Sequence, residues 1–229
     1  MGCHPMNETA SAINRAPIGF IVEGDAEYHC YPSLVCRIVN SSGFRVPRVN
    51  ARGYGNIVRH LADQLKPLVL AHHPYHVIIT LDLKDVLDAG LYDSCEEVRK
   101  ALEDQVTEWL ANSASHARLQ PLPQRIAVVL QVQRFESWMI ADIGGLRDSG
   151  YLAVDEVQPL DADEEVSHPI SWLRTRTSPG RYQKNPRCAK EVISCLDPCI
   201  MRVNSRSFDK FHREVCWSYG RWCQECDLS

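Results

Sequence analysis

The sequence predicts an α/β fold: a parallel sheet with helices on both faces, followed by a mostly helical C-terminal extension. Through the first 142 residues, short apolar runs rich in β-branched residues alternate with segments of helical periodicity. The runs lack clean polar alternation, which is typical of parallel strands buried on both faces. Such alternation of strands and helices indicates right-handed βαβ units. After residue 142 the pattern loosens, so we expect an α/β domain at 1–142 and a helical extension at 143–229 packed on it.

Four apolar runs predict the strands of this sheet. They cover residues 18–22, 44–49, 77–81 and 126–132. The second run is weakened by Pro47, which suits an edge strand or a strand end because proline donates no hydrogen bond to a neighbouring strand.

Helical periods separate these runs. Apolar residues recur at spacings of four and three over 57–68, and at every fourth residue over 98–110. Ser94 precedes the second of these segments and can cap the helix. In the C-terminal part we expect helices at about 186–196 and about 206–218.

Composition and charge limit the classes of partner. A chain of 229 residues with 45% hydrophobic residues can bury a sizeable core. Its formal net charge is −4, so contact with a nucleic acid would need a local basic patch or bound metal ions. No run reaches the roughly 18 apolar residues that a membrane helix needs, and the first residues do not resemble a signal peptide. We therefore expect a cytoplasmic protein without membrane contact.

Ten cysteines are many for an intracellular chain of this length. Cys195 and Cys199, together with Cys223 and Cys226, could supply four thiolates to a structural zinc ion. However, Cys199 follows a proline, and the second pair lies close to the end of the sequence. The pattern therefore favours free thiols over zinc.

Acidic residues stand where three of the predicted strands end. Glu23 closes the first strand, Asp82 closes the third, and Glu136 follows the fourth. In an open α/β sheet, ligands bind outside the carboxyl ends of the strands, where residues distant in sequence become neighbours. These carboxylates could therefore converge on one point.

Converging carboxylates repel one another unless a cation lies between them. Mg²⁺ or Mn²⁺ fits best, because both prefer carboxylate and water oxygens. Glu27 and Asp85 could add a second set of ligands, and Gly24 would let the backbone turn tightly beside a phosphate. The alternative is structural: such residues often cap the following helix, and Glu136 could pair with a cation such as that of Arg134.

Several motifs resemble those of a known family. The segment VEGDAE at 22–27, followed by a hydrophobic strand that ends in Asp82, resembles the TOPRIM nucleotidyl-transfer and nuclease domain. That family has a glutamate after its first strand and a DxD-type motif after its third. The wider pattern is similar to small bacterial TOPRIM proteins related to the OLD nucleases, which are encoded beside AAA- or ABC-type ATPases in phage-defence operons. Further matches are RGYGNI at 52–57, RFESWMIAD at 134–142, YQK at 182–184 and SRSFDKF at 205–211.

The resemblance implies a TOPRIM or Rossmann-like sheet and a Mg²⁺- or Mn²⁺-dependent nuclease that cuts DNA or tRNA in anti-phage defence. An ATPase partner would control it, and a homodimer is left open. By this resemblance Glu23 would be a general acid/base or metal ligand, and Asp82 a metal ligand. Glu136 would supply another carboxylate, and Lys184 would stabilise charge in the transition state.

One position departs from the family pattern. The second acidic position of the DxD motif is Lys84 here, and Asp85 follows it. A shift of one residue would let Asp85 substitute, whereas Lys84 at the site would compete with a cation. The sequence therefore leaves open a two-metal enzyme, a one-metal or weakened enzyme, and an inactive regulatory or sensor subunit that docks on the ATPase.

A basic segment at 174–190 could contact a phosphate backbone. Arg52, near the presumed active edge, is a further candidate. The alternative is a solvent-exposed face whose positive charge balances that of the acidic segment at 155–165. We expect this acidic segment to be a solvated loop. The candidate residues in the basic segment are Arg174, Arg176, Arg181, Tyr182 and Lys184.

Overall fold

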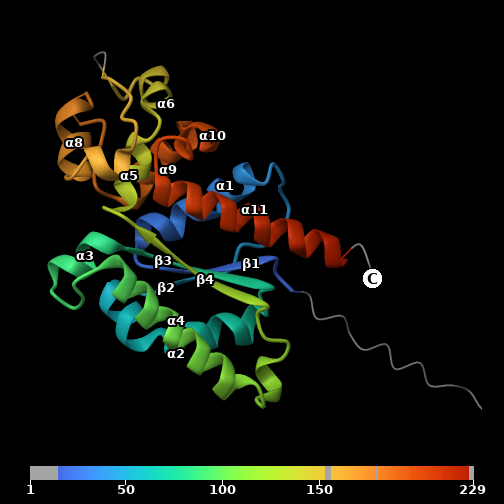
Figure 1. The fold of residues 1–229 in the computed structure, drawn as a ribbon. Coiled ribbons are helices and arrows are strands. Elements are labelled where there is room, and N and C mark those ends of the chain that lie inside the picture. The colour runs from blue at the N-terminus through green and yellow to red at the C-terminus, as the bar shows by residue number, and fades with distance from the viewer. Residues whose placement is uncertain (1–14, 153–155, 179, 227–229) are drawn as a thin grey trace, which may run out of the picture.

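The computed structural model describes residues 15–152, 156–178 and 180–226, without the side chains of 222 and 224–226. Within these residues the chain forms one parallel four-stranded sheet, in the order β2-β1-β3-β4 (Figure 1). The strands are β1 (Ile18–Val22), β2 (Arg48–Asn50), β3 (His76–Asp82) and β4 (Arg125–Gln131).

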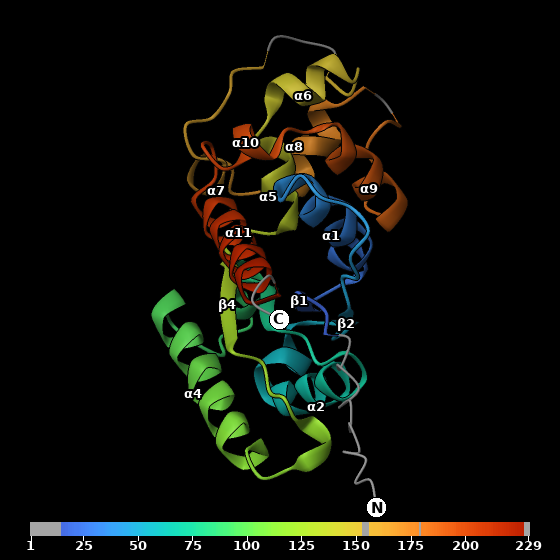
Figure 2. The same ribbon diagram turned by 90° about the vertical axis from the view of Figure 1, so that its right-hand side faces the viewer.

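The strand order places a switch point between β1 and β3. From β1 the chain passes through α1 (Asp25–Ile38) to β2 on one side, and β3 then pairs with the other side of β1. The helices α2 (Tyr54–His72) and α4 (Cys95–Ser113) cover the opposite face of the sheet from α1 (Figures 1 and 2). The predicted class, a parallel α/β sheet with helices on both faces, is confirmed. The shorter elements α3 (Leu83–Asp88) and η1 (Ala117–Leu119) complete this part.

Successive residues of each central strand enter two separate cores. Phe20 and Ile78 belong to the core under α1, whereas Ile21 and Ile79 belong to the core under α2 and α4. Every residue of β1 and β3 is buried. Burial on both faces explains why their sequences read as continuous apolar runs.

The second strand is shorter and later than predicted. The prediction of a strand at 44–49 is wrong, because β2 begins only at Arg48. Pro47 has no N–H to donate, although its carbonyl accepts a hydrogen bond of 2.9 Å from the Phe20 N–H. As Pro47 suggested, β2 is an edge strand.

The C-terminal half is helical, as predicted. The helix that begins at Pro186 ends one residue before the predicted limit, and the helix that begins at Arg206 continues well beyond residue 218. The helices α5 to α11 lie on the same side of the sheet as α1 (Figures 1 and 2). Their bounds are α5 (Phe135–Ile140), α6 (Ile143–Asp148), α7 (Ala162–Glu165), α8 (Pro169–Arg176), α9 (Pro186–Cys195), α10 (Pro198–Met201) and α11 (Arg206–Cys226).

One core joins the two halves of the chain. Phe20 and Tyr31 from the sheet side share it with Trp138, Phe208 and Phe211. The ring of Tyr31 lies 4.9 Å from that of Phe211, and the ring of Trp138 lies 5.0 Å from it. The domain boundary at residue 142 stays a prediction, and this core crosses it.

The acidic segment at 155–165 is not the solvated loop that we expected. Its described part contains α7, and Asp163 is buried. The Asp163 carboxylate accepts hydrogen bonds from the hydroxyls of Ser137 and Ser205 and from the Ser207 N–H. These donors satisfy the buried carboxylate oxygens and connect α7 to α5 and to the start of α11. Asp155 lies outside the described residues.

No helix in the described part of the chain combines the length and the apolar character needed to cross a bilayer.

Candidate metal centre at the carboxyl edge of the sheet

Glu23 is held by the backbone of its neighbours. It follows β1, and one of its carboxylate oxygens accepts a hydrogen bond of 2.8 Å from the Asp82 N–H. The Tyr54 N–H, at the start of α2, also bonds this carboxylate. The Gly53 N–H donates to the Glu23 carbonyl at 2.8 Å. The RGYG loop at 52–55 therefore wraps Glu23, and it does so with Gly53 at φ +113°, in the region that favours glycine.

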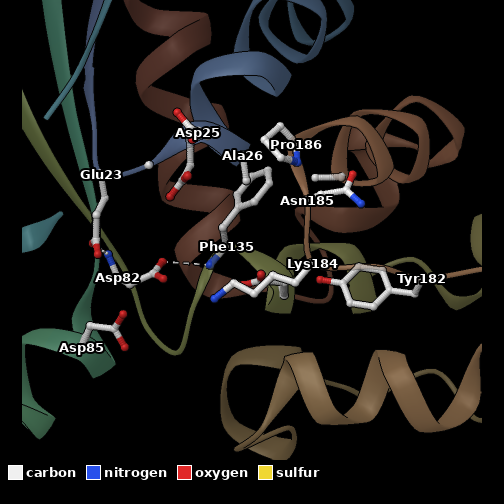
Figure 3. Close-up of a pocket in the computed structure, with 14 residues that line it drawn as sticks. Glu23, Asp25, Ala26, Asp82, Asp85, Phe135, Tyr182, Lys184, Asn185 and Pro186 are labelled. Carbon is white, nitrogen blue, oxygen red and sulfur yellow. Dashed lines mark hydrogen bonds between the residues drawn. The ribbon is translucent and has the colours of Figure 1, made fainter. Parts of the chain in front are cut away.

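Asp82 and Asp85 complete a group of three carboxylates with Glu23. Asp82 ends β3 and occupies the N-cap of α3, and its carboxylate accepts a hydrogen bond of 2.9 Å from the Phe135 N–H. Asp85 lies on the first turn of α3, three residues later, and so on the same side of the helix. One oxygen from each of the three residues lies within 4.8 Å of the others. Figure 3 shows the three side chains on one wall of a cavity.

The cavity has a volume of about 280 Å³ and both acidic and basic walls. Glu27 and Glu136 line it but lie outside the group of three. Lys184 extends from the opposite wall toward the carboxylates (Figure 3). Asn185 and Pro186, which begin α9, line the same wall. All six predicted catalytic and metal residues line this one cavity: Glu23, Glu27, Asp82, Asp85, Glu136 and Lys184.

Burial and mutual repulsion disfavour the charged forms of these carboxylates. Burial raises the pKa of Glu23 to about 7, opposed by the hydrogen bond from Asp82 and increased by the charge of Asp85. Burial, followed by the charges of Glu23 and Glu136, raises the pKa of Glu27 to about 8. Lys184 opposes the shift of Glu27. The cation-free site therefore retains protons near neutral pH.

The same causes act on Asp82 and on the opposite wall. Burial raises the pKa of Asp82 well above its usual value, with contributions from Glu27 and Glu23. Burial, and then the charge of Glu136, raises the pKa of Tyr182. The Tyr182 hydroxyl bonds the Glu136 side chain, so the tyrosine stays protonated and can orient this glutamate.

Lys84, which stands at the second acidic position of the DxD-type motif, is directed away from the acidic cavity. The Lys84 ammonium lies 3.2 Å from Asp88, one turn further along α3, and Lys84 does not line the cavity. Asp85 does line it, and its carboxylate forms an ion pair with Arg134. Arg134 thus pairs with Asp85, whereas the alternative reading of the sequence paired it with Glu136.

Gly24 does not serve the tight turn that we expected. Its backbone is extended, with φ −143° and ψ −177°, which any residue can adopt. A side chain at this position would instead approach the Glu27 carboxylate, at 3.4 Å from the added carbon. That distance is an ordinary van der Waals contact, so neither the backbone nor the space at this position requires glycine.

The basic segment is divided between several places. Lys184 and Tyr182 line the acidic cavity, and Arg174 lines a second cavity. Arg176 forms an ion pair of 3.1 Å with Glu156, and Arg181 lies over the ring of Tyr151 at 5.4 Å. Arg52 belongs to the loop that wraps Glu23, with its own φ at +59°.

The donors at the acidic site fit a hard divalent cation. The group of three offers only carboxylate oxygens, as Mg²⁺ and Mn²⁺ prefer. Burial first, and then neighbouring negative charges, raises the pKa of Glu23 and of Asp82, and a cation would stabilise their charged forms. The cysteines contrast with this group: Cys195 and Cys199 are free and exposed. The side chain of Cys226 lies outside the described residues, so the zinc question stays a prediction.

Sequence reasoning missed two contributors to the site. The first is the backbone of the RGYG loop, whose contact with Glu23 joins residues about 30 positions apart. The second is Asn185, which accepts a hydrogen bond from the Cys188 N–H and so starts α9 at the cavity. Asparagine followed by proline is a typical helix start and could have been recognised.

Fold and site together define a parallel α/β protein with an acidic site at its switch point. Residues 22–215 match the family described as Domain of unknown function (DUF4276), and the chain belongs to that family. The matched region includes Glu23, Asp82, Asp85, Glu136 and Lys184. No curated protein and no solved structure matches the chain.

Proposed function

We propose that this protein is a Mg²⁺- or Mn²⁺-dependent nuclease that hydrolyses phosphodiester bonds of DNA or tRNA. The observation that carries the proposal is the approach of Glu23, Asp82 and Asp85 to within 4.8 Å at the switch point of the sheet. Open α/β sheets bind their ligands at this point.

Glu23, Asp82 and Asp85 would hold the cation. A bound Mg²⁺ or Mn²⁺ supplies an activated water and charge stabilisation for phosphoryl oxygens. The backbone N–H groups of Asp82, Tyr54 and Phe135 fix the carboxylates in advance, so little reorganisation is needed.

The remaining residues of the cavity act on the substrate. Hydrolysis adds a water oxygen to phosphorus and breaks one P–O ester bond, and the proton ends on the leaving oxygen. Lys184 faces the carboxylates and would balance the negative charge that develops on the phosphate oxygens. Glu27 and Glu136 lie at the same cavity and are the candidates for the proton transfer.

The position of Lys84 supports catalysis over the alternative. A non-catalytic regulatory or sensor subunit was favoured by a lysine at the metal site. Lys84 instead pairs with Asp88, and Asp85 takes the place in the cavity. The resemblance to TOPRIM proteins adds the role that we propose: a defence effector controlled by an ATPase partner.

The direct test is cleavage of plasmid DNA and of total tRNA by the purified chain with Mg²⁺ or Mn²⁺. We expect Glu23→Gln and Asp82→Asn to lower the rate by at least about 100-fold, the scale of losing one electrostatic stabiliser. Asp104→Asn is the matched control, because Asp104 lies exposed on α4 outside the cavity and pairs only with the exposed Lys100 among the described residues.

Addition of an ATPase of the kind that the resemblance implies as partner distinguishes a silent enzyme from a protein without activity. Cleavage that survives Glu23→Gln, or that is absent with the ATPase and both metals present, would refute the proposal. Loss in both active-site variants with full activity in Asp104→Asn would support it.

A further inference from the structure

A second cavity lies beside the acidic one, and its charged lining is cationic. It has a volume of about 340 Å³, and Lys84, Arg134 and Arg174 line it together with His168 and Ser171. No carboxylate of a described residue lines it. A cavity with this lining attracts an anion.

The two cavities share a wall. Lys84 and Asp85 are neighbours on α3, and they face the cationic and the acidic cavity respectively. Arg134 lines the cationic cavity and forms an ion pair with Asp85 across the wall. A strand that lies across this shared wall would therefore meet an acidic site on one side and a cationic one on the other.

The cations of this cavity are incompletely neutralised. The only carboxylate that pairs with Lys84 among the described residues, that of Asp88, is itself 55% exposed. Arg174 forms no ion pair with a described residue, whereas Arg176, two positions later, is paired with Glu156. The helix α8 begins at Pro169 on the cavity wall, so the positive end of its dipole adds to the field.

We propose that Lys84 and Arg174 bind an internal backbone phosphate of the nucleic acid, next to the phosphate that is cut. The inference rests on the proposed function in taking a nucleic-acid strand as the ligand, and it deepens that function by naming the residues that hold the strand. An ammonium and a guanidinium are both strong donors to phosphate oxygens. Lys84 replaces the second acidic residue of the DxD-type motif, and in this proposal it anchors the substrate.

The test measures binding without cleavage. All variants carry Glu23→Gln, and the probe is a fluorescein-labelled 20-nucleotide single strand, as DNA and as RNA, with and without a 5′-phosphate. Affinity is measured from low to moderate salt. We expect Lys84→Ala with Arg174→Ala to weaken binding about tenfold and to lower the slope of log affinity against log salt by about 0.7, because both side chains contact one phosphate and each neutralised phosphate contributes about 0.7 for single strands.

Two variants control this experiment. Arg176→Ala removes a cation from the same helix outside both cavities, and we expect it to keep the parent slope. Lys84→Arg preserves the charge and should retain most of the affinity, which excludes a general folding defect.

The outcomes separate the two proposals. An unchanged slope in the double variant would overturn the phosphate site even if the parent chain cuts nucleic acid. A reduced slope would support the site even if the parent proved not to cut. Dependence on Lys84 and Arg174 only for the 5′-phosphorylated probe would overturn an internal phosphate in favour of a terminal one.

Discussion

At the residue scale, the buried carboxylates set the pH dependence of the cation-free protein. The pKa values of Glu23 and Glu27 rise from 4.5 in the unfolded chain to about 7 and about 8 in the folded protein. Between these values the folded state holds protons that the unfolded state has released. The free energy of unfolding therefore falls as the pH rises from about 5 to 8, and the stability is fully present below the unfolded pKa.

The prediction is a melting temperature in EDTA that decreases over this range less steeply in Glu23→Gln than in the parent. The parent should lose on the order of 3 kcal/mol relative to the variant, since each pKa unit is worth about 1.4 kcal/mol. Comparison with the variant cancels the opposite contributions of His72 and His212, whose pKa values are lowered by burial. Thermal unfolding at several pH values measures it, and equal slopes in the two proteins would contradict it.

The residue at which α3 begins decides whether Lys84 or Asp85 lines the acidic cavity. The sequence placed Glu23 and Asp82 correctly at one edge, because the ends of parallel strands meet there. It left Lys84 and Asp85 undecided, because their directions depend on the residue at which α3 begins. The helix begins at Leu83, so Asp85 lies one turn above Asp82, and Lys84 turns toward Asp88.

At the scale of elements, the RGYG loop connects the edge strand β2 to Glu23. Gly53 has φ +113° and ψ +153°, a conformation that is open essentially to glycine alone, and its N–H holds the Glu23 carbonyl. Sequence periodicity could not reveal this function, because the contact crosses between β1 and the start of α2.

We predict that Gly53→Ala lowers the free energy of unfolding by about 1–3 kcal/mol and impairs cleavage, because the backbone strain displaces Glu23. Gly55→Ala is the matched control two residues later: its added carbon meets nothing within 4 Å, and its backbone is helical. The control should be neutral or more stable by up to about 1 kcal/mol, since alanine favours helices over glycine. Urea unfolding of both variants tests the opposite signs, and equal effects would argue against the role of the loop.

Two motifs quoted for the family resemblance, RFESWMIAD and SRSFDKF, contain residues that connect helices of the C-terminal half. Asp142, in RFESWMIAD, is buried and accepts hydrogen bonds from the Gly145 and Asp197 N–H groups. Trp138 donates to the Ser207 hydroxyl of SRSFDKF at 2.8 Å. Asp142 thus connects the start of α6 to the start of α10, and Trp138 connects α5 to α11. Among the residues of RFESWMIAD, Glu136 lines the acidic cavity and Arg134 the cationic one, with Phe135 between them at the acidic cavity.

At the scale of the whole molecule, the helical half supplies one wall of the cavity. Lys184 and Tyr182 come from the segment before α9, and they face carboxylates that come from the sheet. Their positions are fixed by the core that runs from Phe20 through Tyr31 to Phe211. The sequence predicted an extension packed on the sheet, but periodicity alone could not show that the two parts share one core and one site.

A shared core predicts that sheet and C-terminal helices unfold as one cooperative unit. Phe211→Ala, at the centre of that core on α11, should lower the free energy of unfolding by about 3–5 kcal/mol. Trp217→Ala is the control on the same helix: Trp217 is 41% exposed and lies under Arg125 at 4.7 Å, so its loss should cost about 1 kcal/mol. Far-UV circular dichroism and tryptophan fluorescence should give coincident transitions in all three proteins. Separate transitions, with the sheet unaffected by Phe211→Ala, would mean that the helical half folds independently and that the wall carrying Lys184 can move away from the carboxylates.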